Sequence, residues 1–372
     1  MFPPEVVDRI VHALHDDYDT LRLCGLINRD WMAASRYHFL NGKRRMQLTH
    51  HNLPLFLDLL GSPFNTFSTR LERLRVKGVD YTTLKSLWSA LPHFSHLREL
   101  QIGGHFFDPV VDVALLGPEA QIFPRVTSLA IARIFFSSYG TLNSFLARVT
   151  SLSALKIEGL RDIDKFETDI NADHQSSHRL QLHLTSLHLE LGPAMLAWLK
   201  WSGFCLRARE GHLNISHTSS FPIVSEYLSA AQFSRLTLRV HSSNLLLLQY
   251  PPSLIALCLL DPLWMSGSQG DLSVSLNLLP FLRQISLSIP GLQELAFCIV
   301  TLPFPNLAAG LPPTHEEVTS ILDGAGFAGL RRLEFLMSRD IGRDELRATL
   351  ESILPMQFSR GIVRLGVEGP GA

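Results

Sequence analysis

LRELQI, residues 97–102, is one of six copies of a hexapeptide in which apolar residues occupy the first, fourth and sixth positions. The other five are LERLRV (71–76), LSALKI (152–157), LTSLHL (184–189), LIALCL (254–259) and LRRLEF (330–335). Apolar residues at alternate positions are typical of a strand with one buried face, so the last pair of each copy predicts a short strand. A helix would explain the first two apolar residues, which share a helix face, but the last one lies off that face.

Weaker copies extend the pattern along the chain. They are VTSLAI (126–131), FSRLTL (233–238), LRQISL (282–287) and IVRLGV (362–367), and EGHLNI (210–215) keeps only the last two apolar positions. The central positions 74, 100, 129, 155, 187, 213, 236 and 257 differ by 26, 29, 26, 32, 26, 23 and 21 residues. A leucine-rich period of roughly 20–29 residues covers most of these intervals.

Helix-like stretches separate the predicted strands, as at residues 82–91, 194–201 and 316–322. Residues 44–48 and 53–60 look like an irregular first unit of the same design. Strand, turn and helix repeated head to tail predict an α/β solenoid, with parallel strands on its concave face and helices on its convex face. We expect one interior column of leucines formed by Leu74, Leu100, Leu129, Leu155 and Leu187.

A different pattern precedes the repeats. In FPPEVVDRIVHAL, residues 2–14, apolar side chains recur at helical spacing, and Pro4 suits a first helical turn. Asp19 is a plausible N-cap for a second helix over residues 21–27, and a third follows from Trp31 to Phe39. Charged residues interrupt the apolar stretch of the first helix, so we expect no secretory signal.

Composition excludes several classes of function. A net charge of -1 over 372 residues argues against a broad grip on nucleic acid or an anionic membrane. The most apolar segment, residues 245–264, contains prolines and an aspartate that a lipid-exposed helix would tolerate poorly. The 4 cysteines form no C-x-x-C pair, which favours a reducing compartment, cytoplasmic or nuclear, over a disulfide framework.

Motifs for chemistry are weak. GAGFAG, residues 324–329, fits a phosphate-binding pattern, but a helix-like stretch precedes it and a strand-like one follows, which is the reverse of the required order. We expect a helix end and a loop there. His174, His178, His183 and His188 cluster in sequence, yet a five-residue offset turns His183 and His188 to opposite faces of a strand. We therefore predict no enzyme and no catalytic, metal or cofactor site.

With both patterns in view, residues 2–39 resemble an F-box, and the chain resembles fungal F-box proteins with divergent leucine-rich repeats. Phe2, Pro3, Pro4 and Glu5 stand for the family's opening motif of leucine, proline, any residue and glutamate. The second half of the motif is matched by Leu21, Cys24, Leu26, Ile27, Arg29 and Trp31, with Asn28 where cysteine is common. The asparagine that usually follows the repeat strand is absent, and Gly78, Gly104 and Gly159 stand near that place.

The resemblance implies a substrate-recognition subunit of a cullin-RING ubiquitin ligase of the SCF type. A head of residues 1–40 would dock on the Skp-family adaptor and through it on the cullin, and a solenoid of residues 41–372 would bind a protein substrate. The alternative is an interaction scaffold whose head only caps the solenoid. The expected docking surface and its support are Phe2, Pro3, Val7, Ile10, Leu14, Leu21, Ile27 and Trp31.

Overall fold

The computed structural model describes residues 2–14, 17–41, 45–61, 71–78, 87, 94–103, 125–134, 136, 139–160, 182–203, 206–215, 221–240, 248–260, 275–299, 315–337, 344, 347, 348, 350, 351 and 354–367. They fall into two compact units, residues 1–152 and 153–372. The predicted boundary between residues 40 and 41 lies inside the first unit, at the end of its third helix, and stays a prediction.

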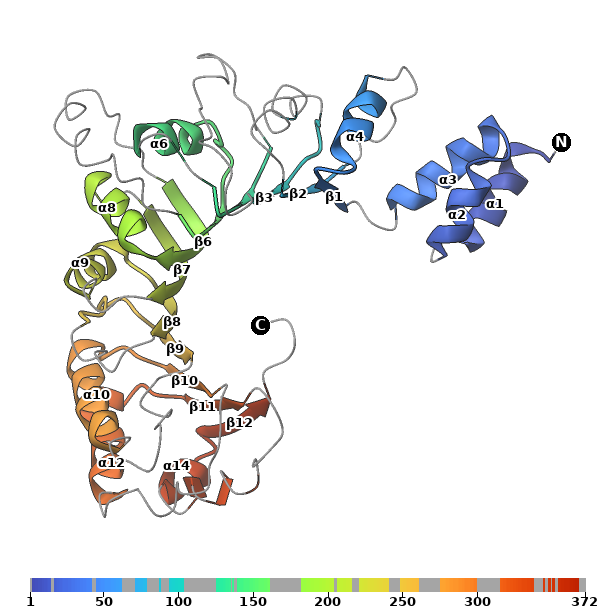
Figure 1. The fold of residues 1–372 in the computed structure, drawn as a ribbon. Helices are drawn as coiled ribbons and strands as arrows, with labels where there is room; N and C mark the ends of the chain where they lie inside the picture. Colours follow the sequence, from blue (N-terminus) through green and yellow to red (C-terminus); the bar gives the residue numbers. More distant parts are fainter. Residues whose placement is uncertain are drawn as a thin grey trace, which may run out of the picture. The chain divides into compact units, whose positions relative to one another are not determined.

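The first unit begins with three helices and continues with strands and further helices (Figure 1). Its elements are α1 (Pro4–Ala13), α2 (Tyr18–Cys24), α3 (Arg29–Asn41), β1 (Arg45–Thr49), α4 (Leu53–Leu60), β2 (Arg73–Lys77), β3 (Glu99–Gly103), β4 (Ser128–Ala132) and α6 (Tyr139–Ala147). β1 and α4 confirm the irregular first repeat unit predicted for residues 44–60. Of the helix predicted over residues 82–91, only Leu87 lies within the described residues, and it is helical.

The second unit consists of strands with described helices between several of them (Figure 1). Its elements are β5 (Ala154–Glu158), β6 (Leu182–Leu191), α8 (Pro193–Trp201), β7 (Leu206–Ile215), α9 (Phe221–Ala231), β8 (Arg235–Val240), β9 (Ala256–Leu260), α10 (Ser275–Ser288), β10 (Glu294–Ile299), α12 (His315–Leu322), η7 (Ala325–Phe327), β11 (Arg332–Met337), α14 (Pro355–Ser359) and β12 (Val363–Val367). The predicted helices over residues 194–201 and 316–322 are confirmed as α8 and α12.

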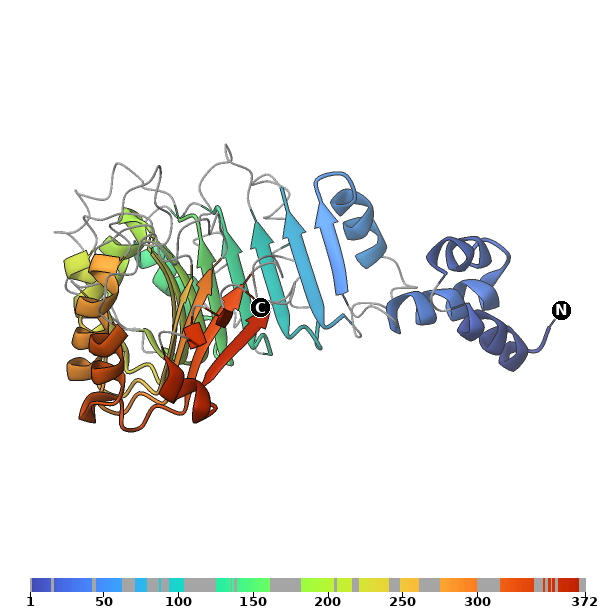
Figure 2. The same cartoon turned by 90° about the horizontal axis from the view of Figure 1, so that it is seen from below.

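The strand pairs in both units are parallel and follow chain order. β1 to β4 run side by side in the first unit (Figure 2), and β5 to β12 do so in the second. Leu74, Leu100 and Leu129 are register partners in the first unit, as are Leu155 and Leu187 in the second. The predicted α/β class is confirmed, and the leucine column is confirmed within each unit.

A backbone hydrogen-bond motif fixes where each strand begins. The N–H groups of Arg98 and Glu99 both donate to the carbonyl of Glu72, over 2.8 and 2.9 Å. In the second unit the N–H groups of Gln293 and Glu294 donate to the carbonyl of Ile255 in the same way, over 2.8 and 3.1 Å. These strands therefore start at the same step of the repeat as the strand before them.

The exit from the strand is also repeated. The residue four positions after the column leucine has left-handed backbone in three strands, at Gly78, Arg133 and Gly159, with φ angles of 60°, 55° and 60°. Glycine adopts this conformation without steric cost. Gly78 and Gly159, two of the glycines that stand in place of the expected asparagine, thus supply the turn that leaves the strand, and Gly104 lies outside the described residues.

Helices cover the face of the sheet that carries the buried leucines. In the second unit α8, α9, α10 and α12 lie along one face (Figure 1). The aromatic rings of Tyr227 and Phe233 meet edge to face between that layer and the strands, with 6.1 Å between centroids. In the first unit Phe56 of α4 stacks on Phe94 with centroids 5.9 Å apart. The other face of each sheet carries the side chains that alternate with the leucines.

The prediction of a strand over residues 282–287 is wrong. LRQISL lies in α10, where Phe281, Leu282 and Ile285 are buried at helical spacing, and Ile289 directly after the helix is buried as well. Leu287, the residue expected to point inward from a strand, is 84% exposed. The strand comes later, as β10, and its segment LQELAF at 292–297 matches the hexapeptide pattern in full.

The register assigned to two strands is also wrong. Residue 211, not 213, occupies the column in β7, because Gly211 pairs with Leu187 on one side and Leu236 on the other. In β12 the column residue is Val363, the partner of Leu333, so the expected position at Leu365 is two residues too far along. Both copies lack a leucine at the first position of the hexapeptide, which would have fixed the register.

Candidate functional site

The three head helices share a small core. Val7, Val11 and Leu21 are buried, and Leu14, Trp31 and Ala34 pack against them while staying partly exposed. These residues come from all three helices, so the core ties the head together. A core of this size buries few side chains, so other apolar residues of the head lie outside it.

The beginnings of the head helices are fixed by local hydrogen bonds. The Pro3 carbonyl accepts from the N–H groups of Val6 and Val7, over 3.0 and 3.1 Å. The predicted N-cap at Asp19 is wrong, because Asp17 accepts from the N–H of Thr20 over 3.1 Å and from its hydroxyl over 2.7 Å. The hydroxyl bond is the main reason that the pKa of Asp17 is lowered.

Asn28 performs the same role for α3. Its side-chain oxygen accepts from the N–H groups of Asp30 and Trp31, over 3.0 and 3.1 Å. Asparagine at this position therefore has a structural explanation, as a side chain that satisfies the free donors of a helix start. The chain from Gly25 to Asn28 is left between two helices, with no helix face to bury its side chains.

Half of the exposed large apolar side chains among the described residues belong to the head. We call these five the exposed head residues: Phe2, Val6, Leu23, Leu26 and Ile27. Leu26 is 82% exposed, which is close to the value for a leucine in an open chain. Isolated exposed apolar side chains are ordinary, and five of them within residues 2–27 concentrate exposed apolar surface on the head.

The predicted docking residues divide into three groups in the structure. Phe2, Pro3 and Ile27 are exposed, Val7 and Leu21 are core residues, and Ile10, Leu14 and Trp31 are half-buried. Only the first group is free to touch a partner with most of its surface. Sequence reasoning missed Val6, Leu23 and Leu26, although the position of Leu26 after Gly25, beyond the end of α2, could have identified it.

The strand face of the second unit holds a cluster of titratable side chains. His188 and His212, on neighbouring strands, stack with centroids 4.2 Å apart, and the His188 Nε2 lies 3.2 Å from the Glu158 carboxylate. Lys156 also contacts Glu158, over 2.8 Å. Burial, the other histidine and Lys156 together lower the pKa of His188 to about 4, although Glu158 acts in the opposite direction.

Burial and then Arg239 lower the pKa of His212 as well. Both imidazoles are therefore neutral near pH 7. The expectation that His183 and His188 face opposite sides is wrong, since the alternation of buried side chains skips a step at Thr185 and Ser186. Neither histidine is buried among the leucines. His174 and His178 lie outside the described residues.

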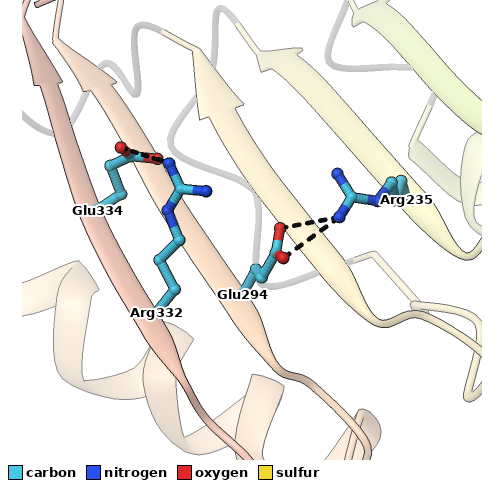
Figure 3. A network of polar contacts seen from close by, with 4 residues as sticks. All are labelled: Arg235, Glu294, Arg332 and Glu334. Atoms are coloured by element: carbon cyan, nitrogen blue, oxygen red, sulfur yellow. Dashed lines mark hydrogen bonds and ion pairs between the residues drawn. The ribbon is translucent and has the colours of Figure 1, made fainter. Parts of the chain in front are cut away.

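A second polar network crosses β8, β10 and β11 on the same face (Figure 3). Arg235 donates to both carboxylate oxygens of Glu294, over 3.2 Å each. Between them in register stands Ala256, whose small side chain leaves room for the pair to meet. Arg332 bonds to Glu334 over 2.7 Å within β11. The network balances two positive and two negative charges.

The glycine-rich segment behaves as the sequence predicts. α12 ends at Leu322, the turn η7 follows, and β11 begins at Arg332. A Cβ atom at Gly326 would lie 2.5 Å from the Ser286 backbone oxygen, so this glycine lets the turn approach α10 closely. Close packing explains the glycine without a phosphate.

Among the described residues, no three or more histidine, cysteine, aspartate or glutamate side chains are arranged so that they could hold a metal ion. None of the described helices is long and apolar enough to cross a membrane. No protein-family model matches the chain, and no curated protein sequence matches it.

Proposed function

We propose that this chain is the substrate-recognition subunit of an SCF-type cullin-RING ubiquitin ligase. In this proposal the head is an F-box that docks on the Skp-family adaptor, and divergent leucine-rich repeats bind a protein substrate. The chain itself carries no catalytic residue. It holds the substrate near the ubiquitin-charged enzyme, so that proximity accelerates transfer.

The observation that carries the proposal is the exposure of apolar side chains on the head. Phe2, Leu23, Leu26 and Ile27 expose most of their surface. Water solvates such groups poorly, and burying a leucine contributes roughly 1.5–3 kcal/mol. A partner that covers these side chains would gain that energy, which is the usual basis of an apolar docking surface.

The repeats support the second half of the proposal. Parallel strands in matched register present rows of side chains on the face opposite the helices. Repeat proteins use such extended faces to bind partners, because the backbone is rigid and the exposed side chains can vary. The described strand faces are rich in charged residues, which favours a polar protein surface as the substrate.

Affinity purification tests the ligase function. The full chain should recover the adaptor and a cullin, identified by mass spectrometry, and Leu23→Asp should reduce their recovery because it places a charge in an apolar contact. Leu23 is 65% exposed, so this change leaves the head core intact. A chain that lacks residues 1–40 should lose the adaptor while keeping proteins bound to the repeats.

Recovery of repeat-bound proteins without any adaptor, from the full chain, would contradict the ligase function. It would instead support the interaction scaffold, in which the head serves as a cap. Leu14→Asp is a poor test, since Leu14 packs on the head core and its replacement would unfold the head.

A further inference from the structure

A row of positive charge occupies the exposed face of β2. Its sequence RLRVK places Arg73, Arg75 and Lys77 at alternate positions, between Leu74 and Val76. The two apolar residues are buried, so the three basic side chains project from the opposite face. Arg75 and Lys77 are exposed, and Arg73 is half-exposed.

The neighbouring strands neutralise only one of these charges. Glu99 on β3 lies beside Arg73 in register, and its carboxylate is 2.9 Å from the Arg73 Nε. Arg75 lies between Gln47 and Gln101, which are uncharged. Lys77 lies between Thr49 and Gly103, which are also uncharged.

The residues beside these cations on the exposed face of the sheet have small side chains or none. On β3 and β4 the exposed-face positions next to Gln101 and Lys77 are filled by Gly103, Ala130 and Ala132. Because these residues are so small, the exposed face of the sheet beside β2 is open to a bound chain segment. Among the described residues of β1 to β4, Arg75 and Lys77 therefore form an uncompensated positive site above a shallow surface.

We propose that this face of the first unit binds an acidic, extended segment of a partner protein. Same-face positions of a strand repeat about every 6.6 Å, and carboxylates at alternate positions of an extended segment repeat at the same distance. Such a segment places one carboxylate at Arg75 and the next at Lys77. This inference rests on the proposed function in one respect, that the partner is the ligase substrate.

Charge balance favours a protein over a nucleic acid. The whole chain has a net charge of -1, and one of the three cations on β2 is already paired. Proteins that hold a nucleic acid by its phosphates neutralise roughly 6–10 of them. The two cations of β2 that have no acidic partner on the described strands match a short acidic segment instead.

Fluorescence anisotropy of the full chain with a labelled peptide tests the inference. The probe is a fluorescein-labelled peptide of about ten residues in which glutamate alternates with serine, long enough to follow β2 from end to end. Its control replaces every glutamate by glutamine. The acidic peptide should bind and the glutamine peptide should not, and binding should weaken as salt is added.

The double variant Arg75→Gln/Lys77→Gln should weaken binding by about 2- to 30-fold, as expected for two exposed charge contacts. Lys200→Gln/Arg331→Gln removes the same charge from exposed positions in the second unit and should bind normally. Equal loss in both double variants, or no salt-sensitive binding of the acidic peptide, would overturn the inference. Tighter binding of a single-stranded oligonucleotide would overturn the choice of a protein partner.

The assay contains no adaptor, so it separates this inference from the ligase function. If the acidic peptide binds but the chain never recovers an adaptor, the inference of an acidic partner is supported and the ligase function is contradicted. If the adaptor is recovered but the peptide does not bind, the ligase function is supported and the inference is contradicted. Circular dichroism of both double variants should match that of the unaltered chain, because all four side chains are exposed or lie outside the core.

Discussion

Replacing Gly211 by leucine should destabilise the protein, although leucine is the residue that the repeat pattern prefers there. Gly211 stands in the interior column between Leu187 and Leu236. The ring of Phe233 fills the space that a column leucine would take. A Cβ atom at position 211 would lie 2.6 Å from the Phe233 Cε1 and 2.8 Å from its Cδ1.

The size of the effect follows from these distances. Carbon atoms in contact prefer about 3.5–4.0 Å, so the ring must move by roughly 1 Å even for the first added carbon. Phe233 is fully buried and packs against Tyr227, which leaves it no open space to enter. Overpacking of this kind costs about 1–3 kcal/mol, and the remaining carbons of leucine place Gly211→Leu at the upper end.

Urea unfolding followed by circular dichroism measures the effect as a shift in midpoint. Phe233→Ala alone should cost about 3–5 kcal/mol, because it leaves a cavity. The double variant Gly211→Leu/Phe233→Ala should cost less than the sum of the two, since leucine then fills the vacated space. Gly291→Leu is the control, because a Cβ at Gly291 meets nothing within 4 Å.

A stable Gly211→Leu protein would refute the register that places this glycine in the column. So would additive effects of Gly211→Leu and Phe233→Ala, because additivity indicates that the two positions do not touch.

Two further predictions concern the second unit. Leu155→Ala should lower the free energy of unfolding by about 2–5 kcal/mol, since Leu155 is 2% exposed and pairs with Leu187 in the column. An unchanged urea midpoint would place Leu155 at the surface. Stability should fall as the pH drops from about 6.5 toward 4, because the pKa values of His188 and His212 are lower in the folded protein than in the unfolded chain. As the pH falls, the unfolded chain therefore binds protons before the folded protein does, which favours unfolding. Charged groups facing the pair are Lys156, Glu158 and Arg239, and the variant His188→Gln/His212→Gln should lose much of this pH dependence in urea unfolding at pH 7 and 5.

The strand assignments show what a hydrophobic pattern can determine. Alternation fixes which face of a strand is buried. The six hexapeptide copies that have a leucine at the first position and no competing helical spacing all contain a strand. In residues 210–215 the alternation gave the correct face, but the register was wrong by two residues. A shift by two keeps every side chain on its face, so alternation alone cannot detect it.

The helix at residues 282–287 was misassigned for a related reason. Apolar residues three apart, here Leu282 and Ile285, satisfy both the hexapeptide and a helix, and Leu287 completes the hexapeptide by chance. The spacing of Phe281, Ile285 and Ile289 is the evidence for a helix, and it extends beyond the six residues of the pattern. Comparing the two periods over a longer window would have separated them.

The head was predictable in its helices and its core, and less so in its surface. Periodicity placed Val7 on the apolar face of the first helix, and the expected docking surface with its support included both Val7 and Leu21, which are core residues in the structure. It could not show that Leu23 and Leu26 are left exposed, because exposure depends on how three helices pack. The caps Asp17 and Asn28 were missed since several polar residues near each helix start could have served.

Calorimetric titration of the purified chain with purified Skp-family adaptor tests the central claim most directly. The account predicts saturable binding at equal stoichiometry, weakened at least about tenfold by Leu26→Asp, which places a charge at an exposed apolar contact. Leu287→Asp changes a leucine of nearly equal exposure, 84% against 82%, on α10 of the second unit and should bind like the unaltered chain. No binding of the adaptor by the unaltered chain, or equal binding by Leu26→Asp, would contradict the account.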